Sequence, residues 1–379
     1  METALLPLDA ALRMLATAYP APDSPALVAD RDDPALDRSA MDGAALRSAD
    51  GLAPRRILGT LFAGDPPGAF TVEPGTCVRI MTGACLPAGA DAVMPIEELR
   101  TEGDRLVPTI EPEPGRHIRR QGEQARTGDL LLAQGRPRTA ARAGLAAQVG
   151  RAPEALRRVR VGVAPTGDEI QDHPQPHQIR DSNGPMLAAL AHALGAEVRR
   201  LPPLPDHPET LRAFLADLGD LDLLLTSGGV SVGERDHLPK VLADLGARSL
   251  FHKICLKPGK PMLAAFLPRP AGAGAVTLLG LPGNPVSAYL NCLLFLPVAM
   301  AGILGTVAPD PWKTGQLRAP VGNPGDRPLL HPCLRTGDQL EPLVCQGSAD
   351  LVSLAQADAC AWVPMGGMGA GPTRYLDLP

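Results

Sequence analysis

The most regular pattern of apolar and polar positions lies between residues 159 and 302, where short apolar runs alternate with longer helix-compatible stretches. Short apolar runs bounded by turn residues predict strands, and the stretches between them predict helices. This alternation is typical of an α/β domain with a mostly parallel sheet. The predicted strands are Val159–Ala164, Glu197–Leu201, Leu221–Leu225 and Val276–Leu279, and the predicted helices are Asn183–Leu194, Pro208–Leu218, His237–Leu245 and Pro285–Gly302.

The flanking regions have other patterns. Residues 1–40 begin with leucines at helical spacing and continue into a stretch rich in Pro and Asp. Residues 41–125 alternate short β-prone pieces with Gly and Pro, which predicts a small β-rich domain. Residues 126–158 contain an Ala-rich helix, and we group them with residues 1–40 as one extended N-terminal region. Residues 303–379 predict a terminal β domain, so the fold class is multidomain α/β plus β.

One uncharged segment, residues 286–308, is long enough to cross a bilayer. Asn291 and Pro297 interrupt it, and no basic residues flank its start. It follows a turn in which Asn284 stands at the N-cap position and Pro285 at the first helical position. These features favour a buried core helix over a membrane span.

Composition narrows the class of protein. The 379 residues suffice for roughly two to four domains. A hydrophobic content of 45% and a net charge of -5 indicate neither a nucleic-acid binder nor a disordered tail. The seven scattered cysteines form no CxxC pair, so we expect neither a disulfide framework nor structural zinc, and a reducing cytoplasm is favoured. The N-terminus lacks the pattern of a signal peptide.

Three glycine-punctuated segments carry the candidate chemistry: Leu221–Asp236, Lys257–Lys260 and Gly280–Ser287. The first and third begin as apolar runs and break into turn residues, as strands do when they end in loops, and open α/β sheets bind ligands at such strand ends. Successive glycines let backbone N–H groups approach an anion closely, and two lysines add positive charge. Together the segments predict a site for a phosphorylated or oxyanionic ligand.

Seven short motifs occur in one order along the chain. They are Ser39-Ala-Met-Asp-Gly43, Ile80-Met-Thr-Gly-Ala84, Pro165-Thr-Gly-Asp-Glu169, Asp181-Ser-Asn183, Thr226-Ser-Gly-Gly-Val-Ser-Val-Gly233 with Asp236, Lys257-Pro-Gly-Lys-Pro261 and Gly280-Leu-Pro-Gly-Asn-Pro-Val-Ser287. In this order they resemble the molybdopterin molybdenumtransferase family, whose animal relative is gephyrin. The resemblance implies a dimeric four-domain protein with a central three-layer α/β domain that binds molybdopterin. The other three domains would be a small β-rich domain, an extended N-terminal domain that serves dimerisation and a C-terminal domain like a β-barrel. It also implies insertion of molybdate into adenylylated molybdopterin, with Mg²⁺, to give molybdenum cofactor and AMP.

The resemblance assigns the molybdate site to Lys257, Lys260 and Ser287. Molybdate is a dianionic oxyanion, so its pocket needs fixed donors rather than a strong nucleophile. The two lysines supply charge, and Ser287 would lie in the first turn of a helix, whose free N–H groups favour anions. The alternative is that the lysines are solvated turn residues and Ser287 an ordinary serine near a helix start.

Asp236, Asp222 and Glu169 form the acidic set that the resemblance assigns to catalysis, with Asp236 and Glu169 as the Mg²⁺ ligands. Carboxylates at strand ends suit Mg²⁺, which bridges to substrate phosphate and keeps several waters. Reaction at a phosphate-linked adenylate also requires that charge be neutralised. The alternative for Asp236 is an N-cap for the helix that begins near His237.

The resemblance also implies binding of molybdopterin and AMP by the turn residues at the strand ends, and catalytic roles for Asp42 and Thr82 in the β-rich region, which would close over the cleft of a second subunit. Capping is the alternative role for Asp181 and Asn183. The implied binding residues are Thr226, Ser227, Gly228, Gly229, Asp181, Asn183, Gly283, Asn284 and Pro285.

The chain also departs from the family pattern. Ala44 replaces the usual Tyr after Met-Asp-Gly, Gln124 replaces the Asp of Gly-Glu-Asp, and the C-terminal region keeps Arg327 and Gln346-Gly-Ser348 only loosely. These losses leave open a preference for tungstate, or a non-catalytic carrier or scaffold that delivers molybdopterin to a client enzyme. A third alternative is the adenylyltransferase that precedes insertion, which the extra β-rich region disfavours. For the molybdenum-inserting enzyme we expect a homodimer with small-molecule substrates, with the adenylyltransferase and molybdoenzyme clients as fitting protein partners, and with neither nucleic acid nor a membrane.

Overall fold

The computed structural model describes residues 5–22, 24–152, 158–204, 207–230, 237–269 and 274–379. The predicted residue Asp236 lies outside these ranges. The chain divides into two compact units, one made of residues 1–22 and 155–379 and the other of residues 23–154. Each unit is described by itself.

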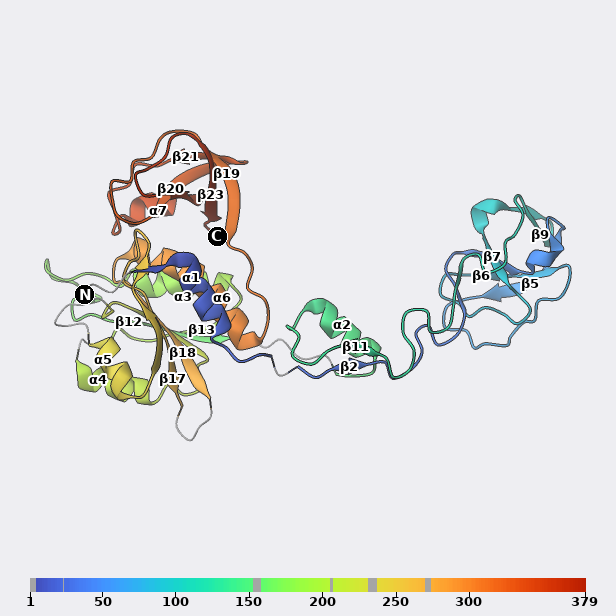
Figure 1. Ribbon diagram of the computed structural model, residues 1–379, viewed down its shortest axis with the longest axis horizontal. Helices are drawn as coiled ribbons and strands as arrows, with labels where there is room; N and C mark the ends of the chain where they lie inside the picture. The colour runs from blue at the N-terminus through green and yellow to red at the C-terminus, as the bar shows by residue number, and fades with distance from the viewer. Residues whose placement is uncertain (1–4, 23, 153–157, 205–206, 231–236, 270–273) are drawn as a thin grey trace. The chain divides into compact units, whose positions relative to one another are not determined.

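The first unit is built on a six-stranded sheet with the order β13-β12-β14-β18-β17-β15 (Figure 1). The first four strands are parallel to one another and correspond to the four predicted strands. The last two are antiparallel and were not predicted; the connection from β17 to β18 is short, which suits an antiparallel pair. The strands are β12 (Arg160–Pro165), β13 (Glu197–Arg200), β14 (Leu223–Ser227), β15 (Arg248–His252), β17 (Leu263–Pro268) and β18 (Ala275–Leu281).

Helices cover both faces of this sheet, because alternate strand residues point to opposite faces. Leu223 and Leu225 pack with α1, α3 and α6, whereas Leu224 between them packs with α4 and α5. The predicted three-layer arrangement is therefore confirmed. The helices are α1 (Leu8–Thr17), α3 (Asn183–Ala193), α4 (Pro208–Ala216), α5 (Leu238–Asp244) and α6 (Pro285–Leu304); β1 (Leu6–Pro7) pairs with β16 (Ile254–Cys255) beside them.

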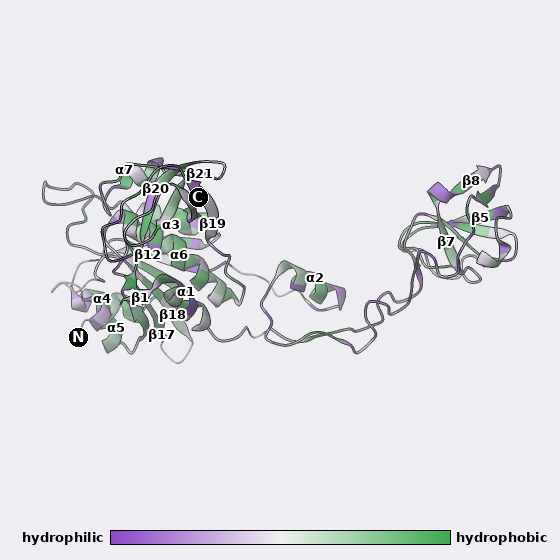
Figure 2. Ribbon diagram, turned by 45° about the horizontal axis from the view of Figure 1, so that its top comes forward, coloured by the Kyte–Doolittle hydropathy of each residue, from purple (hydrophilic) through white to green (hydrophobic). Residues whose placement is uncertain are grey.

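Helix α6 is long and apolar enough to cross a membrane, and it is the one such helix among the described residues. Most of its side chains are buried in the core shared with α1, α3 and the sheet. Figure 2 shows its hydrophobic colour continuing into the strands beside it. The prediction of a buried core helix is confirmed, and the positions of Asn284 as N-cap and Pro285 as first helical residue are as predicted.

The end of the chain forms a closed barrel with the strand order β19-β21-β20-β22-β23. This confirms the predicted terminal β domain. Asp350 is the N-cap of the short helix α7 and accepts a hydrogen bond from the amide of Ser353. The elements are β19 (Trp312–Leu317), β20 (Leu329–Thr336), β21 (Gln339–Pro342), α7 (Leu351–Gln356), β22 (Ala359–Val363) and β23 (Gly371–Asp377).

The second unit holds a six-stranded sheet with the order β7-β4-β6-β5-β9-β8, as expected for a β-rich domain. Two short antiparallel pairs, β2 with β11 and β3 with β10, and the helix α2 complete it. Its elements are β2 (Leu27–Val28), β3 (Arg38–Ser39), β4 (Gly43–Leu46), β5 (Arg55–Leu61), β6 (Thr76–Ile80), β7 (Ala92–Pro95), β8 (Leu99–Glu102), β9 (Arg105–Pro108), β10 (Ile118–Arg119), β11 (Leu130–Leu132), α2 (Ala140–Gln148) and the 3₁₀ turns Ser48–Asp50 and Ile96–Glu98.

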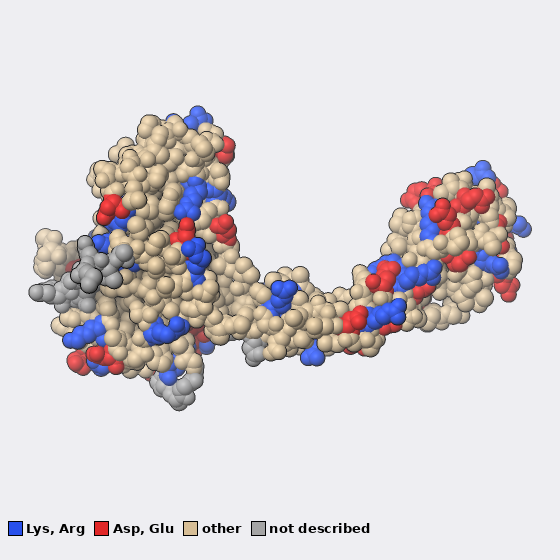
Figure 3. Space-filling view, in the orientation of Figure 1, with Lys and Arg blue, Asp and Glu red and all other residues tan. Residues whose placement is uncertain are grey.

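Charged side chains of both signs are intermixed on the face drawn in Figure 3. On the face drawn in Figure 3, Lys and Arg alternate with Asp and Glu in both units. All seven cysteines are free thiols. The mixture of charges on this face agrees with the modest net charge of -5.

Candidate functional site

A cavity of about 960 Å³ lies in the first unit, where β14 and β18 end and β20 begins. Its walls include Gly228 and Gly229 after β14, Gly283 and Asn284 after β18, and the turn Lys257–Lys260. The structure therefore brings together the three glycine-punctuated segments that the sequence singled out. Two of them follow parallel strands of the main sheet, as expected for an α/β ligand site. The third follows β16, outside that sheet.

The first turn of α6 forms one wall of this cavity. Ser287 lines it, and this residue is almost fully buried. The Asn284 side chain does not cap the helix; its Nδ2 donates to the Ser348 hydroxyl at 2.8 Å. The amide of Val286 donates to the Ser348 carbonyl at 3.2 Å. The start of α6 is thus fixed to the barrel segment that faces it.

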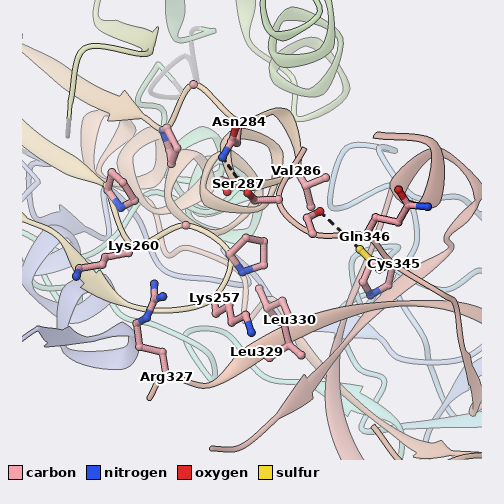
Figure 4. Close-up of a pocket in the computed structure, with 18 of the residues that line it drawn as sticks. Lys257, Lys260, Asn284, Val286, Ser287, Arg327, Leu329, Leu330, Cys345 and Gln346 are labelled. Carbon is pink, nitrogen blue, oxygen red and sulfur yellow. Dashed lines mark hydrogen bonds between the residues drawn. The ribbon is translucent and has the colours of Figure 1, made fainter. Parts of the chain in front are cut away.

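The turn Lys257–Lys260 is joined to the barrel by backbone hydrogen bonds. The Lys257 amide donates to the Pro328 carbonyl at 2.9 Å, and the Leu330 amide donates to the Lys257 carbonyl at 2.8 Å. Arg327 Nη1 donates to the Leu256 carbonyl at 3.0 Å. Figure 4 shows the Arg327 side chain between those of the two lysines. The three cations therefore lie on two segments that are joined to each other by hydrogen bonds.

The charges that line the cavity are mainly positive. Lys257, Lys260 and Arg327 stand against a single carboxylate, that of Glu169, among the described lining residues. Burial lowers the pKa of His331, which also lines the cavity, and so favours its neutral form. Cations held around one cavity attract an anionic ligand.

Two predicted binding residues, Thr226 and Ser227, lie beneath the cavity wall rather than in it. Both side chains are buried, and Ser227 Oγ donates to the Pro282 carbonyl at 3.1 Å. Asn183 Nδ2 donates to Ser227 Oγ and to the Gly283 carbonyl, both at 2.6 Å. Asn183 and Ser227 therefore join the ends of β14 and β18, and the cavity is lined by the glycines that follow them. Pro285 likewise starts α6 outside the cavity lining.

Asp181 has the geometry of a helix-capping residue. Its Oδ1 accepts a hydrogen bond from the Gly184 amide at 2.7 Å, at the start of α3. Its Oδ2 lies 3.4 Å from Nη2 of Arg200. These contacts agree with the capping alternative for Asp181. Asp181 is not among the described residues that line the cavity.

The acidic set is not assembled as the sequence predicted. Glu169 lines the cavity, but Asp222 precedes β14 and therefore lies at the amino end of that strand, away from the cavity. There its carboxylate accepts hydrogen bonds from the Arg160 amide at 2.9 Å and from Nη2 of the same arginine at 3.1 Å. The assignment of Asp222 to a strand end in the site is corrected: it belongs to an ion pair with Arg160. In the described part of the chain no three His, Cys, Asp or Glu side chains form a metal-binding group.

Asp42 and Thr82 meet in the second unit. Asp42 Oδ1 accepts hydrogen bonds from the amide and from the hydroxyl of Thr82, both at 2.7 Å. These bonds lower the pKa of Asp42, so its carboxylate stays charged. Two motifs that are far apart in sequence therefore form one small exposed cluster.

Several lining residues were not assigned a role from the sequence. Arg327, His331, Gln346 and Ser348 come from the barrel and its loops. The available signal was the loose match of Arg327 and Gln346-Gly-Ser348 to the family pattern. His331 belongs to none of the sequence motifs. Its position follows from the tertiary fold, in which its Nε2 lies 2.9 Å from the Leu343 carbonyl oxygen.

Comparison with known proteins gives this arrangement a family. Residues 7–150 match the MoeA N-terminal region (domain I and II), and residues 162–301 match a probable molybdopterin binding domain. The chain is 38% identical over 290 residues to a molybdopterin molybdenumtransferase of Synechococcus elongatus, covering 73% of this chain and 71% of that protein. It is 34% identical over 356 residues to one from Nostoc, covering 88% and 80%.

Solved structures agree on the fold. A molybdopterin biosynthesis MoeA protein from Pyrococcus horikoshii OT3 superposes with a TM-score of 0.72 at 22% identity, over 99% of this chain and 100% of that one. The family matches extend over the β-rich unit and the α/β domain, and the two relatives are 38% and 34% identical to this chain over the aligned residues. The chain belongs to the molybdopterin molybdenumtransferase family.

Proposed function

We propose that this protein is a transferase that inserts molybdate into adenylylated molybdopterin, giving molybdenum cofactor and AMP. The observation that carries the proposal is the convergence of Lys257, Lys260 and Arg327 with Ser287 on one cavity, in a chain of this family. A tetrahedral dianion needs several fixed donors around it, and charge-assisted hydrogen bonds are the strong ones. Ser287 adds a hydroxyl in the first turn of a helix, where anions are favoured.

The rest of the cavity suits the phosphorylated partner. Gly228, Gly229 and Gly283 expose backbone along the wall, and such turns hold phosphate through their N–H groups. Asn284 and Gln346 add amide groups on the α6 and barrel sides. In this proposal the pterin lies along these loops, and the oxyanion lies deeper, between the cations and Ser287.

Glu169 is compatible with a Mg²⁺ ligand. Mg²⁺ in phosphoryl sites is commonly held by one or two carboxylates together with substrate phosphate and water, so one lining carboxylate suffices as an anchor. Asp236 is proposed as the second ligand from its motif. When bound, Mg²⁺ would neutralise charge on the adenylate phosphates, and Glu169 and Asp236 would be the residues that hold it.

Asp42 and Thr82 are proposed to complete the site of a second chain in a homodimer. Support comes from their motifs, from their hydrogen-bonded pairing and from their position in a unit separate from the cavity. Light scattering at micromolar concentration tests the assembly. A monomer that releases AMP at the full rate would contradict this part of the proposal. We further propose a cytoplasmic location, which the free thiols and the buried α6 support.

The test of the proposed function is reconstitution from adenylylated molybdopterin and molybdate, with release of AMP and formation of active cofactor as the two readouts. Lys257→Ala should need far more molybdate, while Lys240→Ala, on the exposed side of α5, should behave as wild type. Pterin binding without AMP release by the wild-type protein would instead favour the carrier. Consumption of ATP to adenylylate molybdopterin would favour the adenylyltransferase.

A further inference from the structure

We propose that two buried asparagines, Asn291 and Asn323, are positioning residues that set the affinity of the cavity for its oxyanion without contacting it. Each carboxamide holds one of the two segments that carry the cations. The inference rests on the proposed function, since it takes the oxyanion to be molybdate. It concerns residues that no sequence motif in this chain marks.

Asn291 holds the turn Lys257–Lys260 through a hydrogen bond from helix α6. It lies on α6 four residues after Ser287, and residues at that spacing share one face of a helix. Its side chain is fully buried, and its Nδ2 donates to the Gly259 carbonyl at 3.0 Å. Gly259 lies between Lys257 and Lys260, so this bond fixes the backbone from which both ammonium groups extend.

The turn and the Asn291 carboxamide approach so closely that there is no space for a side chain at Gly259. Gly259 has φ +119°, and a Cβ built on it would lie 2.6 Å from Oδ1 of Asn291. Only glycine allows this approach, because any side chain would collide with the carboxamide or strain the backbone. The turn is therefore seated directly on Asn291.

Asn323 holds the other segment in the same manner. Its side chain is buried, and its Nδ2 donates to the Arg327 carbonyl at 2.8 Å and to the Pro364 carbonyl at 3.0 Å. The second bond anchors it to the turn after β22. Arg327 therefore extends from a backbone that is tied to the barrel.

In both asparagines only the donor half of the carboxamide is used. Among the described residues, Oδ1 of Asn291 and Oδ1 of Asn323 are buried and have no hydrogen-bond partner. A buried acceptor left unpaired costs free energy, and an apolar side chain of similar size would avoid that cost. The N–H donors to Gly259 and Arg327 are what the carboxamides provide at these positions.

The two segments are also joined to each other, through the backbone bonds of Lys257 to Pro328 and Leu330. The backbone that carries the three cations is therefore held in place before the anion arrives, although the mutual repulsion of the cations opposes this arrangement. A site assembled in advance binds more tightly, because less ordering is needed on binding. Removing either carboxamide should weaken the binding of the oxyanion and leave the binding of the pterin almost unchanged.

The test measures binding of molybdate alone, by calorimetry, to Asn291→Ala and Asn323→Ala. We expect each to bind about three- to tenfold more weakly, which is about 0.7–1.4 kcal/mol at 1.4 kcal/mol per decade. Turnover at saturating molybdate should stay near the wild-type rate. Two matched controls lose buried groups without touching the cation segments: Cys292→Ala on α6 and Thr373→Val in the barrel, whose hydroxyl bonds to the Trp362 carbonyl. Both should bind within about twofold of wild type.

A double-variant cycle separates positioning from general destabilisation. If Asn291 acts through the lysine turn, adding Asn291→Ala to Lys260→Ala should weaken binding less than it does in wild type. Should the alanine variants fold poorly, Asn291→Ser and Asn323→Ser remove less volume and are too short to reach the same carbonyls. Either pair gives the same comparison.

The outcomes distinguish this inference from the proposed function. Wild-type molybdate binding that Lys257→Ala abolishes, with both asparagine variants binding as wild type, overturns the inference alone. An absence of molybdate binding in wild type, or full binding by Lys257→Ala, overturns the proposed function and this inference with it. Equal weakening by the two control variants also overturns the inference, since it would then reflect loss of packing.

Discussion

Asp42 accepts two hydrogen bonds from Thr82 through one and the same oxygen, Oδ1, each 2.7 Å long. Among the residues that the structure describes, none forms a hydrogen bond with the other carboxylate oxygen, Oδ2. Because both bonds favour the charged form, the pKa of Asp42 lies below its ordinary value of 3.8. Thr82 therefore both orients this carboxylate and keeps it ionised.

Replacing Thr82 with Val should raise the pKa of Asp42 toward its ordinary value. A depressed carboxylate pKa contributes stability that is present above the unfolded pKa and is lost as the pH falls through the folded pKa. The wild-type protein should therefore lose this contribution below about pH 4, and Thr82→Val should show a smaller loss over the same range. The measurements are an NMR titration of the carboxyl carbon and unfolding curves against pH. Thr109→Val is the control, since its hydroxyl bonds to a backbone carbonyl instead; an unchanged Asp42 pKa in Thr82→Val would contradict the prediction.

Asp222→Asn should affect stability and leave chemistry intact. The Asp222 carboxylate is nearly buried and binds Arg160 at the amino end of β14, so removing its charge should cost about 1–3 kcal/mol of unfolding free energy. AMP release per folded molecule should match wild type. Thermal unfolding and the reconstitution assay check the two halves. Lost AMP release with an unchanged melting temperature would restore the catalytic assignment that the sequence suggested.

Asp236→Asn should separate pterin binding from metal insertion. The substitution keeps size and capping ability but removes the charge that would hold Mg²⁺ against the adenylate. The variant should bind pterin, fold normally and lose AMP release. A wild-type rate with the wild-type Mg²⁺ dependence would leave Asp236 with the capping role alone.

Gly259→Ala should weaken molybdate binding more than an equivalent change elsewhere. Alanine at positive φ is strained at any site, but at Gly259 it would also meet the Asn291 carboxamide at 2.6 Å. Gly195→Ala is the matched control, with φ +87° and no neighbouring atom in the way. Both should lose roughly 1 kcal/mol or more of stability from the backbone. Only Gly259→Ala should raise the molybdate requirement, and equal requirements in the two variants would count against the seating of the turn.

The parallel part of the sheet and its helices could be predicted from the sequence, because each strand is a short apolar run that ends in a turn. The antiparallel strands β15 and β17 were missed, since Arg248–His252 is mixed in polarity and its partner lies beside a Gly-rich connection. Asp222 entered the acidic set through the family resemblance and not through its place in the chain: it stands at the start of the apolar run, whereas open α/β sheets bind ligands where their strands end.

The loops that line the cavity were predicted from the sequence, whereas the residues that hold these loops in place were not. Glycines and lysines indicate an anion site by their residue type alone, so Gly228 and Lys257 could be predicted to line the cavity. Asn291 lies in an apolar helix, and Arg327 lies in a Gly/Pro-rich loop far along the chain. Their relation to the cavity comes from tertiary contacts with Gly259 and Leu256, which no local pattern encodes.

The backbone pairing between Lys257 and β20 makes the barrel part of the anion site rather than a detachable neighbour. A chain cut after α6 would lose the partners of the Lys257 amide and carbonyl, so the remaining α/β domain would keep its lysines but not the backbone geometry that aims them.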